Sequence, residues 1–460
     1  MSCLWDSIAP SGESIGGEFL GRGGKVMLAE LAAGSLFGSA LESLRGRSVL
    51  LVTREQLPTA LALVELDGVA RRMVLCTPDL SAQQLAGVAA TAEADAIVLD
   101  ADPLLAPAGL CPYVLAARPL AADVKRGGGG PTEWILLTSG TTGTPKLVLH
   151  TLRSLGGALP TRTSAAMHSV WSTFYDIRRY GGLQIYLRAV LSRSPLVLSC
   201  AGESTPDFLA RAAAAGVTHI SGTPSHWRRV LMSGDAALLN PRYVRASGEI
   251  ADQALLDSLQ AAYPKARVAH AFASTEAGVA FDVNDGRAGF PRALIDHCAG
   301  DIALKVVDQT LRIRSGRNAA RYLGGESKIL VSDDGYVDTG DMVELVDGRY
   351  YFRGRTGGVI NVGGLKVYPE EVESILNADP RVRMSLVRAR RNPITGAVVV
   401  ADVVLADPAA AAEPNAQQSV KTDLIDACRR VLAAHKVPAM VRFVPSLEFT
   451  AAGKLVRPNP

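Results

Sequence analysis

The sequence has no run of the ~20 apolar residues that a helix needs to cross a bilayer, so no membrane span is expected. Residues 1–30 lack a basic segment followed by an apolar core, and no secretion signal is therefore predicted. The net charge of +3 is small for 460 residues, which gives no reason to expect nucleic acid or an anionic membrane as a partner. These absences are typical of a soluble protein of the cell interior.

The six cysteines form no CxxC pair and no His/Cys cluster at zinc spacing. Scattered free thiols are typical of a reducing compartment, so a cytoplasmic location is expected. Hydrophobic residues make up 48% of the chain and charged residues 20%, which predicts a sizeable folded core. Because 460 residues exceed one ordinary core, we expect two domains.

Short apolar runs alternate with segments of helical periodicity in the first hundred residues. Ser48–Thr53, Arg72–Cys76 and Ala96–Asp100 are predicted to be buried strands, with helices at Pro58–Ala70 and Ser81–Ala94 between them. The same alternation continues with Leu196–Cys200, Asp207–Ala215, Val217–Ser221, Ala251–Tyr263 and Arg267–Phe272. Strands that alternate with crossover helices predict an α/β fold of parallel sheets.

The character of the sequence changes after Gly354. A glycine-rich stretch is followed by a predicted helix, Pro369–Asn377, two predicted strands, Met384–Arg390 and Ala397–Leu405, and a predicted helix, Val420–Ala434. This pattern predicts a small α+β domain. We therefore expect an N-terminal domain of residues 1–354 and a C-terminal domain of residues 355–460.

The loop Thr138–Lys146, with the sequence TSGTTGTPK, directly follows the apolar strand Trp134–Thr138. Glycines let backbone amides approach an anion, hydroxyls add donors, and the lysine supplies a positive charge, so the loop suits a polyphosphate. It departs from the P-loop pattern GxxxxGK[ST], which disfavours an ordinary P-loop ATPase.

With this loop, residues 134–457 resemble the superfamily of AMP-forming acyl-CoA synthetases, adenylation domains and luciferases. The other motifs follow in the order expected for that superfamily: FASTE at Phe272–Glu276, DTGD at Asp338–Asp341, GRTGG at Gly354–Gly358 and TAAGK at Thr450–Lys454. The resemblance implies a large N-terminal domain of layered sheets and helices and a small mobile α+β C-terminal domain.

The resemblance also implies residue roles. Phe272 should stack on adenine, Thr275 should bind the α-phosphate, and Asp341 should accept the ribose hydroxyls. Lys454 should contact the substrate carboxylate and phosphate oxygens, which makes Lys454, Thr275 and Glu276 the expected catalytic residues. The expected nucleotide and cofactor contacts are Thr138, Ser139, Gly140, Thr141, Thr142, Gly143, Lys146, Gly248, Glu249, Phe272, Asp341, Arg355 and Gly364. Glu276 and Thr142 are the expected ligands of Mg²⁺.

Two departures from the family pattern concern the hinge and the acid pocket. Gly357 stands at the expected hinge, where relatives usually carry Asp or Lys, and glycine permits rotation without a side chain to hold either pose. The pocket segment contains Asp176, Arg178 and Arg179 where an apolar wall is usual. One hypothesis is that one of these charges recognises a polar group on the acid, and the alternative is that they form ion pairs at the surface of the domain.

The function implied is ATP-dependent activation of a carboxylic acid, with an aryl or short acyl acid favoured. The acyl-adenylate would then react with the thiol of CoA or, alternatively, with the phosphopantetheine of a separate carrier protein. ATP, Mg²⁺ and CoA are therefore the expected cofactors, and a monomer or homodimer is expected. The main rival is a non-catalytic nucleotide-binding relative. Such a relative is expected to lack Lys454 or Glu276, and both residues are present here.

Overall fold

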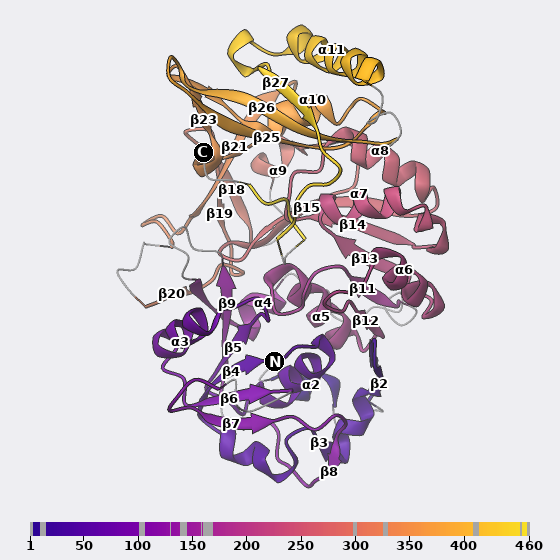
Figure 1. Ribbon diagram of the computed structural model, residues 1–460. Helices are drawn as coiled ribbons and strands as arrows, with labels where there is room; N and C mark the ends of the chain where they lie inside the picture. Colours follow the sequence, from indigo (N-terminus) through magenta and orange to yellow (C-terminus); the bar gives the residue numbers. More distant parts are fainter. Residues whose placement is uncertain are drawn as a thin grey trace.

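The computed structural model describes residues 3–9, 15–100, 106–128, 130–138, 145–157, 159, 169–297, 301–324, 330–407, 414–450 and 453–457. The molecule consists of two large, mainly parallel sheets, an antiparallel sheet beside them, and a separate C-terminal layer (Figure 1). No helix among these described residues is both long enough and apolar enough to span a bilayer.

The first large sheet has eight strands within the described chain. Its order is β16 (Gly278–Val283), β15 (Arg267–Ser274), β14 (Tyr243–Ser247), β13 (His219–Gly222), β11 (Trp171–Thr173), β12 (Leu196–Leu198), β1 (Glu18–Gly21) and β2 (Gly24–Met27). The strands from β15 to β1 run parallel, and the two edge strands are antiparallel to their neighbours.

The second large sheet has seven described strands. Its order is β20 (Arg321–Leu323), β10 (Lys146–Thr151), β9 (Glu133–Thr138), β5 (Arg72–Cys76), β4 (Ser48–Val52), β6 (Ala96–Leu99) and β7 (Cys111–Val114). Strands β9, β5, β4, β6 and β7 run parallel. Strand β10 is antiparallel to β9, and β20 is antiparallel to β10. A short pair, β3 (Gly34–Ser35) and β8 (Leu120–Ala121), lies apart from these sheets.

Two helices fill the space between the large sheets. Helix α2 (Gln56–Leu66) and helix α5 (Tyr180–Ser192) contribute to one hydrophobic core that also contains side chains of β4, β9 and β12. Both helices are buried almost all round, as expected for helices enclosed between two apolar surfaces. The outer face of the first sheet is covered by α6 (Thr205–Ala214), α7 (Pro224–Ser233) and α8 (Gln253–Ala262), and that of the second by α3 (Ala82–Thr91).

The antiparallel sheet was not predicted from the sequence. Its order is β17 (Phe290–Pro291), β22 (Arg349–Arg355), β21 (Val337–Val346), β19 (Thr310–Arg314) and β18 (Ala303–Val307). It has its own core around Phe290 and Leu311. The remaining short helices are α1 (Leu4–Ile8), α4 (Leu152–Gly156) and α9 (Ala293–Asp296), with 3₁₀ turns at Leu28–Ala32, Gly38–Leu44 and Asp235–Leu238.

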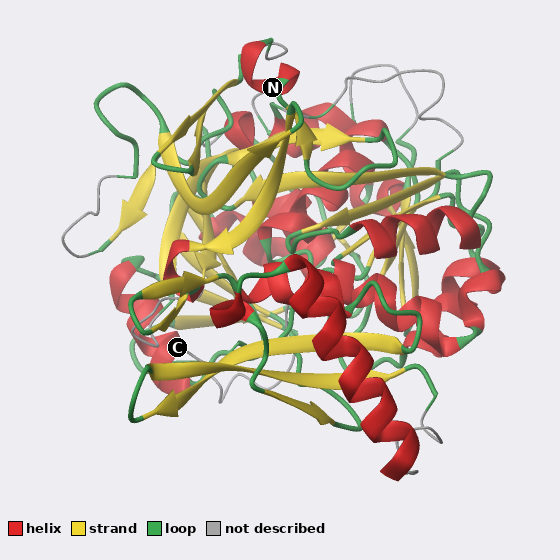
Figure 2. Ribbon diagram, turned by 90° about the horizontal axis from the view of Figure 1, so that it is seen from above, coloured by secondary structure: helices red, strands yellow, loops and turns green. Residues whose placement is uncertain are grey.

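The C-terminal layer has a separate hydrophobic core that extends from Ile360 to Val441. It contains the hairpin of β23 (Ile360–Val362) and β24 (Leu365–Val367), the sheet of β25 (Val382–Asn392), β26 (Gly396–Leu405) and β27 (Met440–Phe443), and helices α10 (Pro369–Leu376) and α11 (Pro414–Val431). Figure 2 shows α11 lying across this sheet. Pro369 at the first helical position and Glu370 and Glu371 in the first turn favour the start of α10.

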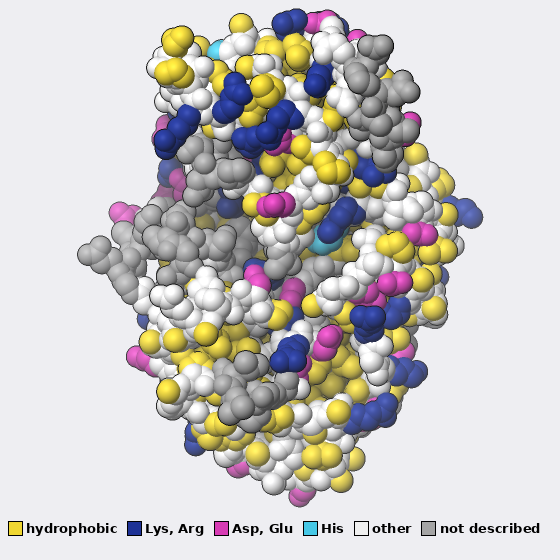
Figure 3. All heavy atoms as spheres, in the orientation of Figure 1, with side chains coloured by type: hydrophobic (Ala, Val, Ile, Leu, Met, Phe, Trp, Pro, Cys, Tyr) yellow, Lys and Arg dark blue, Asp and Glu magenta, His cyan; other side chains and the backbone are white. Residues whose placement is uncertain are grey.

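The chain connects the two parts twice. The 3₁₀ turn Thr356–Gly358 links β22 to β23, and the segment after β27 descends towards the middle of the molecule (Figure 1). On the face drawn in Figure 3, the described Lys and Arg side chains are interspersed with Asp and Glu.

Candidate functional site

The two ends of the Thr138–Lys146 loop meet across a hairpin. Thr138 ends β9 and pairs directly with Lys146, the first residue of β10. The Lys146 ammonium nitrogen lies 5.5 Å from the centre of the Tyr322 ring in β20. The residues expected to wrap the phosphates between these ends, Ser139, Gly140, Thr141, Thr142 and Gly143, lie outside the described residues.

The turn that carries Thr275 and Glu276 is tied to the same hairpin. His150 Nε2 in β10 lies 2.7 Å from the carbonyl oxygen of Thr275, and the Tyr322 hydroxyl donates to Glu276 Oε1 at 3.2 Å. Burial and the Glu276 carboxylate raise the pKa of Tyr322, so its hydroxyl stays protonated as a donor. Tyr322 therefore contacts both the phosphate-loop lysine, Lys146, and the predicted magnesium ligand, Glu276.

Glu276 is half-buried in this turn. Within the described part of the chain, no group of three His, Cys, Asp or Glu side chains forms a metal site. A Mg²⁺ ion bound to the Glu276 carboxylate would thus take its other ligands from phosphate oxygens, water and the loop hydroxyls, which is how magnesium is usually held beside a nucleotide.

Phe272 lies at the seam between the first large sheet and the antiparallel sheet. Its ring stacks on Phe352 of β22, with ring centres 5.1 Å apart and planes 6° apart, and packs 5.9 Å from Phe281. The Phe272 side chain remains half-buried. The aromatic neighbours fix the orientation of the ring that was predicted to stack on adenine.

Asp341 and Arg355 face each other across β21 and β22. Arg355 Nε donates to Asp341 Oδ1 at 3.1 Å, and the negative charge of Asp341 raises the pKa of Arg355. Asp341 Oδ2 is buried without a partner among the described residues. A buried carboxylate oxygen without a donor is costly, so this atom suits a hydroxyl donor such as a ribose, and the site fits the nucleotide on this point.

Lys454 lies against the loop that follows β14. A β-carbon built at Gly248 would lie 3.4 Å from Lys454 Cε and 3.8 Å from its Nζ. Although Lys454 retains access to solvent, the crowding of protein around its amine lowers the pKa of Lys454, and the Arg355 charge lowers it further, while Glu249 and Asp341 oppose the shift. Lys454 therefore lies within electrostatic range of the Asp341–Arg355 pair, although the two come from different parts of the chain.

Two other expected site residues have different surroundings. The Glu249 carboxylate accepts hydrogen bonds from the backbone of Ser225 and Leu455. Gly364 lies in the β23–β24 turn, where its N–H donates to Asn361 Oδ1 at 2.9 Å and a β-carbon would meet no atom within 4 Å. Gly364 thus makes none of the contacts that join the residues above.

The charges in the predicted acid pocket are paired. Arg178 is buried, donates to both oxygens of Asp176 at 2.8 and 2.6 Å and also donates to the Thr53 carbonyl. Arg179 donates to both oxygens of Asp79 at 3.1 and 2.9 Å. All three charges therefore form ion pairs, as the alternative expected, but the Asp176–Arg178 pair is largely buried and not at the surface of the domain. The Arg179 charge also acts on Lys454.

Three contributors were missed at the sequence level. His150, Tyr322 and Phe352 belong to none of the motifs and become neighbours of the site only through strand pairing, for example Val148 opposite Tyr322. Burial lowers the pKa of His150 to about 4, so its ring is neutral near pH 7.

Comparisons with known proteins identify the family of the chain. The family model described as AMP-binding enzyme matches residues 53–319, and the model described as AMP-binding enzyme C-terminal domain matches residues 371–454. The mitochondrial acyl-coenzyme A synthetase ACSM5 of Homo sapiens is 36% identical over 138 residues, which cover 30% of this chain and only 23% of that relative. The 2-succinylbenzoate–CoA ligase of Geobacillus kaustophilus is 29% identical over 359 residues, covering 70% of this chain and 67% of that ligase.

Solved structures share the fold along nearly the whole chain. The anthranilate CoA ligase AuaEII in complex with anthranoyl-AMP has a TM-score of 0.79 at 18% identity, covering 98% of this chain and 94% of that one. ATP-bound MatB from Rhodopseudomonas palustris has a TM-score of 0.78 at 20% identity, covering 99% and 97%. The predicted fold, a large α/β part followed by a small α+β part, is confirmed.

Proposed function

Because the chain belongs to the AMP-binding enzyme family, we propose that it activates a carboxylic acid with ATP and transfers the acyl group to the thiol of CoA. Two features of Asp341 support this most directly. Its carboxylate lies within electrostatic range of the Lys454 amine, and its Oδ2 is buried without a partner among the described residues. A carboxylate that accepts the ribose hydroxyls would hold the nucleotide, and a positively charged side chain would offset the charge that forms when the α-phosphate is attacked.

The reaction would proceed in two steps. In the first, a carboxylate oxygen attacks the α-phosphorus of ATP, the bond to the bridging oxygen of the β-phosphate breaks, and pyrophosphate leaves. Lys146 and Lys454 would offset the negative charge that develops on the phosphate oxygens, and Glu276 would hold Mg²⁺, which supplies further charge. Thr275, Gly248 and Phe272 would position the nucleotide, and fixing both reactants in one site supplies part of the acceleration.

In the second step, the thiol sulfur attacks the acyl carbon, AMP leaves, and the thiol proton passes to solvent. We place the boundary between the two domains after Gly354 and the hinge at Gly357, so that residues 355–460 turn between the steps. The Gly364 turn would then approach the thiol. Delivery to the phosphopantetheine of a separate carrier protein is the alternative acceptor, and it uses the same thiol chemistry.

An aryl or short acyl acid is the substrate class we favour. Support comes from the activities that similar proteins are named for, which include the 2-succinylbenzoate–CoA ligase and acetyl-coenzyme A synthetase 2 of Zygosaccharomyces bailii, 27% identical over 373 residues. A cytoplasmic location and a monomeric or homodimeric state remain predictions.

The test is pyrophosphate release with MgATP and a panel of aryl, short-chain, long-chain, amino and dicarboxylic acids, with hydroxylamine to trap the adenylate. We expect turnover with one class, and the addition of CoA or a carrier protein then identifies the acceptor. If no acid supports release by protein that binds ATP, the proposed activity is wrong and the non-catalytic alternative gains support.

A further inference from the structure

The tail that carries Lys454 is hydrogen-bonded to the large domain on both sides of the lysine. The Thr223 hydroxyl donates to the carbonyl oxygen of Gly453 at 3.0 Å, and the N–H of Leu455 donates to Glu249 Oε1 at 3.1 Å. Gly453 and Leu455 are the immediate neighbours of Lys454. The two bonds therefore fix the backbone from which the lysine projects.

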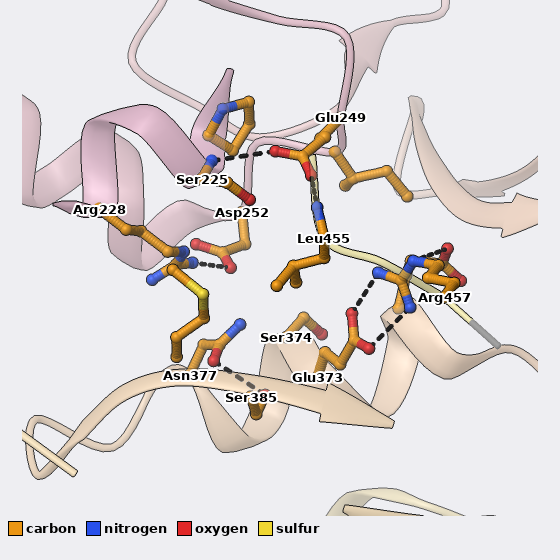
Figure 4. A pocket seen from close by; sticks show the side chains of 14 residues that line it. Ser225, Arg228, Glu249, Asp252, Glu373, Ser374, Asn377, Ser385, Leu455 and Arg457 are labelled. Carbon is orange, nitrogen blue, oxygen red and sulfur yellow. Dashed lines mark hydrogen bonds and ion pairs between the residues drawn. The ribbon is translucent and has the colours of Figure 1, made fainter. Parts of the chain in front are cut away.

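Glu249 is itself held in place by the large domain. Its second oxygen, Oε2, accepts from the N–H of Ser225 in the first turn of α7 at 2.9 Å, and Figure 4 shows the carboxylate between Ser225 and Leu455. Both oxygens are thus engaged. The Glu249 side chain is occupied with the tail, which leaves the backbone of its loop for the expected contact with the nucleotide.

Close packing also limits how the tail can lie. Gly453 has φ +71°, and a β-carbon there would lie 1.9 Å from Cε1 and 2.1 Å from Nε2 of His226. The His226 ring is fixed by Thr223, whose hydroxyl lies 2.8 Å from Nδ1, and by stacking on Phe174 at 5.3 Å. The surface of His226 therefore accepts the tail only where the tail has a glycine.

At its far end the same tail is bound to the small domain. Arg457 donates to both oxygens of Glu373 in α10 at 2.8 and 2.7 Å. A rotation of the small domain would therefore carry the tail with it and break the bonds to Thr223 and Glu249, whose partners would then bind water. The bonds belong to the pose described here, in which Lys454 lies against the Gly248 loop.

We propose that Thr223 and Glu249 are positioning residues that hold Lys454 for the adenylation step and release it before the thiol step. The inference rests on the proposed function, because it divides that reaction into a step that needs the two bonds and a step that does not. Neither side chain touches the reacting atoms in this scheme.

The test compares both half-reactions in Thr223→Val, Thr223→Ser, Glu249→Ala and Glu249→Gln. Valine keeps the shape of threonine without its hydroxyl, whereas serine keeps the donor, so the pair isolates the bond to Gly453. We expect ATP–pyrophosphate exchange to fall ~10-fold in Thr223→Val and Glu249→Ala, the change that corresponds to one lost hydrogen bond. Glu249→Gln should lie between wild type and alanine, and Thr223→Ser should restore most of the rate.

Thiolysis of supplied acyl-adenylate by CoA should stay within about 2-fold of wild type in both Thr223 variants, because that step does not use the bonds. In the Glu249 variants thiolysis should fall less than pyrophosphate exchange does. Parallel loss of both half-reactions, or unchanged pyrophosphate exchange, would overturn the proposal.

Thr223 also caps α7 by accepting from the N–H of His226, so thermal melting is recorded for each variant. The Glu249 variants keep this cap and preserve the test if Thr223→Val fails to fold. A rise in the KM for ATP at unchanged kcat would instead indicate a nucleotide contact.

Hydrogen exchange gives a readout independent of activity. The Leu455 amide should exchange faster in Glu249→Ala than in wild type, and exchange at an equal rate would contradict the hydrogen bond on which the proposal rests. If wild-type protein releases no pyrophosphate with any acid, the proposed function fails. Hydrogen exchange at the Leu455 amide still decides whether the tail is held.

Discussion

The Lys454 amine illustrates how single residues depend on their surroundings here. Its pKa lies below the ordinary lysine value of 10.5 because neighbouring protein displaces water and Arg355 repels its charge. Only the protonated amine offsets phosphate charge, so kcat/KM for ATP should fall on the alkaline side, through a pKa below 10.5. Lys454→Arg should move this limb upward, because a guanidinium keeps its proton. If the alkaline fall in kcat/KM stays at the same pH in Lys454→Arg, another group is responsible for it.

Removal of the amine tests its role more directly. Lys454→Ala should reduce adenylation by ~100-fold or more, the size seen when a charged transition-state contact is removed, and should retain thiolysis of supplied acyl-adenylate. Pyrophosphate exchange and thiolysis measured on one preparation provide the comparison. Unchanged adenylation would remove Lys454 from the site.

Asp341 offers a second test at this scale, because its Oδ2 has no partner within the described part of the chain. Asp341→Asn replaces a charged carboxylate, which accepts from the ribose hydroxyls, with a neutral amide. The KM for ATP should therefore rise ~10-fold or more, as expected for the loss of a charged hydrogen bond. Asp347→Asn is the matched control, since Asp347 is exposed in the turn of the same β21–β22 hairpin. Equal effects of the two substitutions would show that net charge, and not the unpaired oxygen, is responsible.

The 3₁₀ turn between β22 and β23 is the element on which the proposed domain rotation would depend. A β-carbon at Gly357 would meet no atom within 4 Å, and this residue is not in the left-handed region. Gly357→Ala should therefore raise stability by about 0.4–1 kcal/mol by restricting the unfolded chain. The same restriction should slow the thiol step more than adenylation. Thermal melting and the two half-reactions check this, and an equal change in both steps would place the hinge elsewhere.

Sequence periodicity predicts individual elements well where one face or both are apolar. The predicted strand Arg72–Cys76 is β5 itself, and the predicted helix Pro369–Asn377 exceeds α10 by one residue. The antiparallel sheet escaped prediction because its strands lack a clear alternation: in β21 only Val337, Met342 and Val343 are buried. The motif Asp338–Asp341 lies within this irregular strand, so its residues were found by resemblance and not by periodicity.

The family resemblance drawn from five motifs is confirmed, whereas the contacts that assemble the site could not be read from the sequence. Tyr322 reaches Lys146 and Glu276 only because β20 pairs with β10, and Thr223 reaches Gly453 across 230 positions of sequence. Such pairings depend on how the sheets and the tail pack. Motifs thus locate the candidate site residues, and the fold determines which other side chains contact them.

At the scale of the whole molecule, polar links join the two parts. Hydrogen bonds and ion pairs such as those of Glu249 with Leu455 exchange readily with water, and interfaces of this kind permit relative domain motion. A ligand that contacts both parts should shift the population towards the pose with Lys454 inserted. A stable acyl-sulfamoyl adenosine, which imitates the acyl-adenylate, is such a ligand.

Limited trypsin digestion measures this shift. Lys366 is exposed in β24 near the hinge, and Lys265 is exposed in the large part just before β15. Trypsin cuts within a strand only after the strand opens locally, and the analogue opposes opening by holding the small part in the described pose. It should therefore slow cleavage after Lys366 ~10-fold or more at 100 times its dissociation constant, where binding stabilises the bound form by about 2.7 kcal/mol. Cleavage after Lys265 should change little, because the two parts need not move for trypsin to reach it. Equal protection of both sites would indicate general stabilisation, and no protection at Lys366 would mean that the analogue does not hold the two parts together.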